Sequence, residues 1–159
     1  MTFSIKGGIH PHINKEMTHA GPIERMPAPP VIIVPMSQHI GTPCVPIVKV
    51  GEKVLLGQKV GDSKAAVSCP VHSSVSGFVL AIEPRWHPNG SKVLSVVVEN
   101  DYENKEVNSI WDEDDEIINY PPDEIIRIVR EAGIVGMGGA GFPAHIKIMT
   151  AIEKKVDKL

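Results

Sequence analysis

The chain has 159 residues, 42% of them hydrophobic and 22% charged, which is enough to bury the core of one ordinary domain or two small ones. Its formal net charge of −3, with the basic residues spread along the chain, argues against a nucleic-acid partner. No apolar run approaches the roughly 20 residues of a membrane-spanning helix, and no apolar secretion signal follows Met1. We therefore expect a cytoplasmic chain without a membrane span.

The residue types that usually hold metals are few and scattered. Cys44 and Cys69 are the two cysteines, and neither is in a CxxC pair, so they cannot supply a four-thiolate zinc or iron–sulfur site. His10, His12 and His19 have no acidic residue or cysteine clustered beside them, and His39 and His72 suit hydrogen bonds in turns better than metal ligation. We expect no metal site.

The first 30 residues contain Pro11, Pro22, Pro27, Pro29 and Pro30, which suit neither a helix nor a central strand. We expect an irregular arm at 1–30, either packed on the next domain or flexible. Residues 31–100 have the pattern of a β domain. Short strands are predicted at 31–34 (buried), 48–54, 56–61, 76–83 and 92–99, with glycines in the tight turns and a hairpin turn at Pro88-Asn89-Gly90.

An acidic connector at 101–120, with its charges concentrated at 112–116, leads to one clear helix. Pro122, Asp123 and Glu124 suit a first helical turn, an isoleucine-rich stripe follows, and Gly133 is a suitable C-cap. The segment 145–155 alternates apolar and basic residues, and its secondary structure stays open.

A glycine-rich run comes directly after this helix. Gly136, Gly138 and Gly141 satisfy G-x-G-x-x-G, but a helix precedes the run and Phe142-Pro143 follows it, so we reject a Rossmann fingerprint. Four glycines in six residues still let backbone N–H groups approach an anion or a flat ring, and Lys147 suits a phosphate counter-charge. A hinge between domains is the alternative. The candidate cofactor-binding residues are Gly136, Met137, Gly138, Gly139, Ala140, Gly141, Phe142, Pro143 and Lys147.

The run from Gly136 to Lys147 resembles the flavin- and NADH-binding loop of the NADH-oxidising subunit of respiratory complex I. Met137, Ala144 and His145 stand where that pattern has arginine, threonine and glycine. Met137 and His145 are more similar to the RnfC family of subunits in the Rnf electron-transport complex, whereas Ala144 departs from the usual threonine of that family. The segments 7–11, 37–41, 70–77 and 87–90 also resemble the RnfC family, so the resemblance covers essentially the whole chain.

The resemblance implies a mainly β fold: a barrel-sandwich hybrid domain, then a helix and the start of an α/β FMN/NADH-binding domain of the complex I type at 121–159. It implies a peripheral subunit on the inner face of the cell membrane that exchanges hydride with NAD(H) through FMN. Its partners would be the other Rnf subunits, and its 4Fe-4S clusters would be bound by CxxCxxCxxxCP runs downstream. We expect a chain that stops at Leu159 to hold no cluster, to lack useful affinity for flavin and to be inactive by itself.

Two other functions stay open. The first subunit of the sodium-pumping quinone reductase has similar domains without NADH dehydrogenase activity, which would make this chain a non-catalytic scaffold or binding module. Lipoyl and biotinyl carrier domains share the barrel-sandwich fold, and Lys64 is the lysine that a carrier would modify. The spacing from Lys64 to Gly77 does not fit the carrier pattern, so we expect an ordinary surface lysine near a turn.

Overall fold

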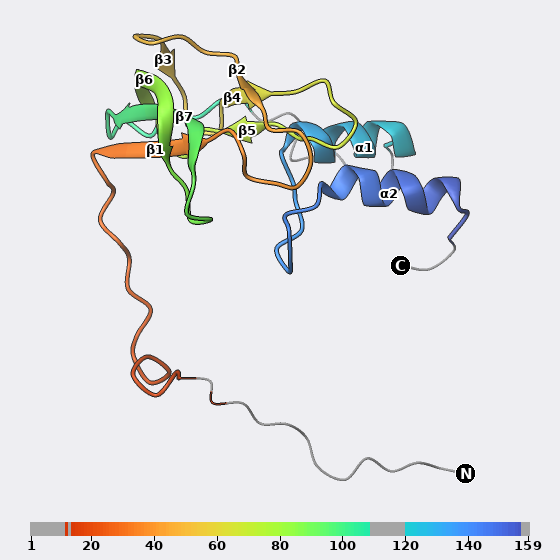
Figure 1. Cartoon of the computed structure of the whole chain (residues 1–159), viewed down its shortest axis with the longest axis horizontal. Helices are drawn as coiled ribbons and strands as arrows, with labels where there is room; N and C mark the ends of the chain where they lie inside the picture. The colour runs from red at the N-terminus through yellow and green to blue at the C-terminus, as the bar shows by residue number, and fades with distance from the viewer. Residues whose placement is uncertain (1–11, 13, 109–119, 157–159) are drawn as a thin grey trace.

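A computed structural model describes residues 12, 14–108 and 120–156, and in this part of the chain most of the fold is β structure (Figure 1). One sheet has the strand order β1-β7-β6-β3, and the second has the order β2-β4-β5. All neighbouring strands are antiparallel. The strands are β1 Val31–Pro35, β2 Val45–Pro46, β3 Lys53–Val54, β4 Lys59–Asp62, β5 Val71–His72, β6 Gly77–Trp86 and β7 Lys92–Asn100.

The long hairpin of β6 and β7 is the centre of the larger sheet. Its two strands pair from Gly77 opposite Asn100 to Trp86 opposite Lys92, with one bulge. The turn predicted at 88–90 closes this hairpin, and Gly90 has a φ of +83° there, which glycine adopts without strain. The tip of the hairpin, residues 87–91, follows the last paired residues, Trp86 and Lys92, and projects away from the rest of the β domain (Figure 1).

The core of the β domain is built from small aliphatic side chains, because the sequence has few aromatic residues. Val96 and Val98 alternate toward the inner face of β7 and are fully buried. They pack in a cluster made almost wholly of valines, with Met36 and Cys44: Val34, Met36, Cys44, Val48, Val54, Val60, Val71, Val75, Val79, Val96 and Val98. The cluster draws on both sheets, which makes one core for the domain.

Two expectations about the strands were wrong. The strand at 31–34 is not buried, because β1 is an edge strand and turns one face outward: Val31 is 40% and Ile33 is 47% exposed, whereas Val34 is buried. The segments 48–54 and 56–61 contain only the short β3 and part of β4. Turns closed by the Glu52 amide on Lys49 and by the Gln58 amide on Leu55 interrupt them.

The two helices lie side by side next to the end of the domain that carries β4 and β5 (Figure 1). α1 spans Pro122–Glu131, with the predicted proline and acidic residues in its first turn. Gly133 follows its end with a φ of +69°, which confirms the predicted glycine cap. α2 spans Ala144–Glu153, so the segment left open by the sequence is a helix.

The segments outside these elements differ in how they relate to the domain. Residues 14–28 are exposed and lead away from it (Figure 1), and Pro29 and Pro30 are the first to hydrogen-bond to it, through Asn100. The expected connector at 101–120 begins with residues that are hydrogen-bonded to the β domain, since Glu106 forms a bridge with Leu56 and the Val107 amide donates to the Leu56 carbonyl. The acidic run at 112–116 lies outside the described residues. Among the described helices, none has the length and apolar character needed to cross a membrane.

Candidate functional site

The glycine-rich run forms a loop between α1 and α2 whose base is closed by backbone pairing. Val135 pairs with Pro143 in an antiparallel bridge. The Gly136 amide donates to the Phe142 carbonyl at 2.9 Å, and the Ala144 amide donates to the Ile134 carbonyl at 3.0 Å. These contacts hold the two ends of the loop together, so residues 136–142 project as one unit. Hereafter we call residues 136–142 the glycine loop.

A Rossmann fingerprint has a strand before its glycine loop and a helix after it, and the sequence predicted neither here. The structure confirms the absence of the strand but not the absence of the helix. A helix, α1, precedes the loop where a Rossmann fold has a strand. However, α2 begins directly after Pro143, so a helix does open from the loop. Pro143 did not prevent this helix because it occupies the N-cap, ahead of the positions that need backbone donors.

The glycine loop is docked on the β domain at the segment that follows β1. The Ile40 amide donates to the Ala140 carbonyl at 3.0 Å. Gly141 has a φ of +65°, and a Cβ there would lie 3.0 Å from the Gln38 carbonyl oxygen and 3.2 Å from the His39 Cα. Position 141 therefore requires glycine both for its backbone conformation and for its close approach to the β domain.

Two other glycines of the loop have no such structural reason. A Cβ at Gly138 or Gly139 would meet no atom within 4 Å, and neither residue has a positive φ. Within the described residues, the amide N–H groups of residues 137–141 donate no hydrogen bond. The loop thus presents a run of backbone donors that have no acceptor within the described residues, and an anion-binding loop uses donors of this kind.

A groove of about 770 Å³ lies between the glycine loop and the β domain. Three segments line it: residues 37–40, the tip of the β6–β7 hairpin, and the loop itself. Its volume is in the range of small-molecule and cofactor sites, roughly 300–1,000 Å³. We call it the loop groove, and its lining residues are Ser37, Gln38, His39, Ile40, His87, Asn89, Val135, Gly136, Met137, Gly139, Ala140 and Gly141.

The candidate residues predicted from the sequence divide into two sets. Five of them line the loop groove, and Met137 is the most prominent because it is 99% exposed. Gly138, Phe142, Pro143 and Lys147 are outside the lining set. The Nζ of Lys147 lies 5.9 Å from the centre of the Phe142 ring and beside Gly136, so its charge is at the base of the loop.

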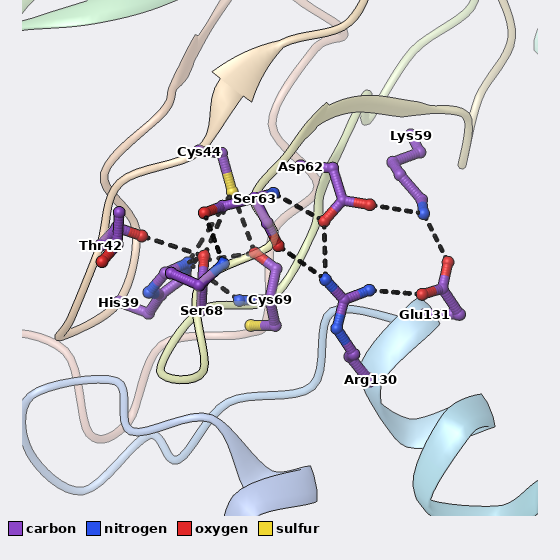
Figure 2. Close-up of polar contacts among 11 residues, drawn as sticks. His39, Thr42, Cys44, Lys59, Asp62, Ser63, Ser68, Cys69, Arg130 and Glu131 are labelled. Carbon is purple, nitrogen blue, oxygen red and sulfur yellow. Dashed lines mark hydrogen bonds and ion pairs between the residues drawn. The ribbon is translucent and has the colours of Figure 1, made fainter.

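The floor of the loop groove is held by a buried network around His39 (Figure 2). The Nε2 atom of His39 lies 3.0 Å from the Cys69 carbonyl oxygen, and its Nδ1 atom lies 3.1 Å from the Ile40 carbonyl oxygen. The Ser68 hydroxyl lies 3.4 Å from the same Nε2 and donates to the Thr42 carbonyl at 2.9 Å. His39 therefore hydrogen-bonds to a turn, as expected, and fixes the segment on which the glycine loop docks.

Charged side chains fasten the end of α1, and with it the start of the glycine loop, to β4 (Figure 2). Arg130 donates to Asp62 at 2.9 Å and to the Ser63 carbonyl at 2.8 Å, and Lys59 bridges Asp62 and Glu131. Burial alone would raise the pKa of Asp62 and of Glu131. Hydrogen bonds from Lys59 and Arg130 outweigh it and hold both pKa values below their usual range.

His145, in the first turn of α2, is buried although the sequence singled it out only as a departure from a pattern. Its Nδ1 atom has no hydrogen-bond partner within the described residues. Burial lowers the pKa of His145, and the nearby Arg130 and His39 lower it further. His145 is thus held neutral in the contact between the helices and the β domain.

The two cysteines do not form a cofactor site. Cys44 and Cys69 are buried free thiols. Burial raises the pKa of both, that of Cys69 to about 11, whereas a metal or cluster binds the thiolate. An iron–sulfur cluster takes four such ligands, so the residues of this chain do not fit one. Among the described residues, no three His, Cys, Asp or Glu side chains are grouped to hold a metal ion.

Sequence reasoning missed the contribution of the β domain to this site. Gln38, His87 and Asn89 line the loop groove, yet the segments 37–41 and 87–90 were not proposed as parts of a binding site. Their polar side chains at predicted turns were the available signal. Nothing in the spacing along the chain indicates that these two turns lie opposite the glycine loop.

Comparison with known proteins agrees with this architecture. Residues 3–103 match the family described as the RnfC barrel sandwich hybrid domain. The chain is 46% identical over 160 residues to the C subunit of the Na(+)-translocating ferredoxin:NAD(+) oxidoreductase complex of Acetobacterium woodii, covering 97% of the chain and 34% of that protein. It is 40% identical over 162 residues to the C subunit of the proton-translocating ferredoxin:NAD(+) oxidoreductase complex of Clostridium ljungdahlii, covering 99% and 34%.

A third relative is the C subunit of the ion-translocating oxidoreductase complex of Vibrio cholerae, 35% identical over 153 residues, with 93% of the chain and 19% of that protein covered. The chain thus spans about a third or less of the length of these relatives. The match extends through the barrel-sandwich domain and, in these relatives, through nearly all of the present chain. The chain therefore belongs to the RnfC family.

Proposed function

We propose that this chain is the nucleotide-binding N-terminal part of an electron-transfer subunit in an ion-translocating ferredoxin:NAD oxidoreductase. The observation that carries the proposal is the glycine loop, which lines the loop groove and has amide N–H groups without acceptors within the described residues, in a chain of the RnfC family. The names of two relatives describe ferredoxin:NAD(+) oxidoreductase complexes. In such a complex the subunit would lie on the inner face of the membrane against the other subunits.

The cofactor that we propose for the loop groove is FMN or NAD(H). The fit rests on Gly139, which lines the groove and leaves space where a side chain would stand, and on donors suited to phosphate oxygens. When bound, FMN would supply hydride and single-electron chemistry. The residues of this chain would bind and orient the nucleotide: the loop amides at its phosphate, and Lys147 as a nearby positive charge.

The domain division follows from the same proposal. Residues 1–30 would be an arm, 31–100 the barrel-sandwich domain and 101–120 a connector, of which residues 105–107 pair with the β domain at Leu56. Residues 121–159, with α1, the glycine loop and α2, would begin an α/β FMN/NADH-binding domain of the complex I type. 4Fe-4S clusters would belong to parts of the subunit other than the segment described here, because the two buried thiols do not fit them.

A binding titration with a charge placed in the loop groove tests this function. The protein at its native length is titrated with FMN and with NADH, and compared with Gly139→Glu. Position 139 has room for a side chain, so the variant should fold, but its carboxylate would repel a phosphate and weaken binding by roughly ten-fold or more.

Gly21→Glu is the matched control, because it adds the same charge to the exposed arm, where a Cβ would meet one atom at 3.5 Å. It should bind both nucleotides as the native protein does. If the native protein binds neither FMN nor NADH, the function is wrong and a scaffold role is favoured. If Gly139→Glu binds both as tightly as the native protein, the glycine loop is not the site.

A further inference from the structure

The tip of the β6–β7 hairpin forms the wall of the loop groove that stands opposite the glycine loop. His87 and Asn89 both line the groove. They come from the β domain, whereas the loop comes from the helical segment. The hydrogen bonds within the tip determine which polar atoms are left for a ligand.

The backbone of the tip selects the tautomer of the neutral His87 ring. Its Nδ1 atom accepts a hydrogen bond from the Asn89 amide at 3.3 Å. A backbone N–H can only donate, so Nδ1 carries no proton and the neutral ring carries its proton on Nε2. Within the described residues this Nε2–H has no acceptor. His87, which lines the groove, therefore carries a hydrogen-bond donor that no described residue uses.

Asn89 is fixed in a similar way by the residue that follows the turn. Its Oδ1 atom accepts from the Ser91 amide at 3.0 Å and from the Ser91 hydroxyl at 2.8 Å. This occupies the oxygen and leaves the Nδ2 amide with two donors that no described residue uses. Both groove-lining side chains of the tip are thus oriented as donors by the fold itself.

The opposite wall has the same polarity. The amides of the glycine loop are free donors, and the Ala140 carbonyl, which would repel an anion, is engaged by the Ile40 amide. None of the lining residues is an aspartate or a glutamate. A groove with donors on two walls and no fixed negative charge matches a ligand group made of acceptors, and phosphate is that group in a nucleotide.

The geometry points to His87 and Asn89 as phosphate-binding residues that complete the nucleotide site from the β domain. A phosphate of the nucleotide lies between the glycine loop and the hairpin tip and accepts hydrogen bonds from both. This inference rests on the proposed function and adds a second set of ligand-binding residues, from the hairpin tip, to the proposed site. It also gives the barrel-sandwich domain a direct part in binding, beyond supporting the loop.

Asn89→Asp is the variant that separates ligand binding from folding. The aspartate keeps the Oδ1 acceptor for both Ser91 bonds and keeps a residue that favours this turn, while it replaces the Nδ2 donors with negative charge. His87→Asn is the second variant: its side-chain oxygen can accept from the Asn89 amide in place of Nδ1, while its shorter NH2 group does not extend to the position of the Nε2 donor. Asn104→Asp, exposed and outside the groove, is the matched control for charge.

The three variants and the native-length protein are titrated with FMN, NADH, riboflavin and inorganic pyrophosphate. We expect Asn89→Asp to weaken FMN or NADH binding by roughly ten-fold or more, since a charge-assisted hydrogen bond is lost and a repulsion is gained. His87→Asn should weaken it by a smaller factor, and Asn104→Asp should leave it unchanged. Riboflavin, which has no phosphate, should bind Asn89→Asp as it binds the native protein.

The outcomes distinguish this inference from the proposed function. If the native protein binds FMN or NADH and Asn89→Asp binds equally tightly, the hairpin wall is overturned while the function stands. Equal losses for FMN and riboflavin would also overturn it, because the phosphate would not be the group recognised. If only pyrophosphate binds and Asn89→Asp weakens it, the phosphate wall stands and the cofactor assignment fails. If no probe binds, both fail.

Discussion

Glycine has opposite structural roles in the β domain and in the glycine loop. In the β domain, a Cβ at Gly77 would lie 1.7 Å from the Glu99 carbonyl oxygen, and one at Gly61 would lie 2.6 Å from the Met36 sulfur. In the loop, a Cβ at Gly138 or Gly139 would meet nothing within 4 Å. The first pair is required by packing, whereas the second pair stands in open space.

This difference separates residues that serve the fold from residues that are free to serve a ligand. Glycine loses more conformational freedom on folding than any other residue. For Gly141 the offset is the docking of the loop on Gln38, through a positive φ and a close approach. For Gly138 and Gly139 the described structure offers no such reason, and Gly139 lines the loop groove.

The largest effect is expected for Gly77→Ala. Its φ of +154° and the 1.7 Å approach to the Glu99 carbonyl leave no space for a methyl group between β6 and β7. The free energy of unfolding should fall by about 4 kcal/mol or more, and the protein could fail to fold. Urea denaturation measures it, with Gly21→Ala as the control. An unchanged midpoint would show that the hairpin can move apart freely.

A smaller loss is expected for Gly141→Ala, which tests the docking of the loop. A side chain at a φ of +65°, 3.0 Å from the Gln38 carbonyl, should destabilise the protein by about 1–2 kcal/mol. Hydrogen exchange of the Ile40 amide is the specific measurement, because that amide donates to Ala140. Its exchange should accelerate more than that of amides in the β7 strand. Equal acceleration throughout would indicate global destabilisation only.

Glu131→Gln tests the attachment of α1 to β4. The substitution keeps the shape of the side chain but removes the negative charge that Lys59 and Arg130 contact, at a site about one quarter exposed. We expect a loss of about 1 kcal/mol at pH 7, less at high salt. Glu124→Gln is the matched control on the same helix, since its partner Arg127 is largely exposed. A larger midpoint shift in the control would contradict the assignment.

The contact between the helices and the β domain should weaken in mild acid. Burial lowers the pKa of His145 and of His72 below that of an unfolded histidine. The unfolded chain therefore binds more protons, and stability that is fully present above about pH 6.5 is lost as the pH falls toward the folded pKa values. Asp62 and Glu131, with lowered pKa values, add a further loss below about pH 4.5.

Urea midpoints at pH 7.5, 6.5 and 5.5 measure this acid effect. His145→Gln removes one of the two titrations, so its midpoint should depend less on pH than that of the native protein. His19→Gln, on the exposed arm, should keep the native dependence. If His145→Gln follows the native curve, the protonation of His145 is not coupled to folding.

The smallest effect on stability is expected for Gly138→Ala. Because the methyl group would meet nothing within 4 Å, the free energy of unfolding should stay within about 0.5 kcal/mol or rise slightly. Thermal and urea unfolding both measure it. A loss above about 1 kcal/mol would show that the fold needs this glycine, and the contrast between the two regions would disappear.

Local patterns in the sequence predicted the elements whose causes are local. Pro122 and the acidic residues that follow it start α1, and Gly133 ends it, because caps depend on neighbouring residues. The turn at Gly90 and the alternation in β7 were predicted for the same reason. α2 was not predicted, since its apolar and basic residues give no clear period. The exposure of β1 was missed because the residues of a strand do not indicate whether it lies at the edge or in the centre of a sheet.

By itself, the sequence determined the β class, the hairpin, the first helix, the family and the position of the glycine loop. The tertiary structure alone decided that the loop docks on residues 37–40, that His145 is buried, and that His87 and Asn89 lie across a groove from the loop. The physical reason is that these contacts join segments far apart in the chain. Packing and long-range ion pairs, such as that of Arg130 with Asp62, bring these segments together. The spacing of residues along the chain does not indicate where the segments meet.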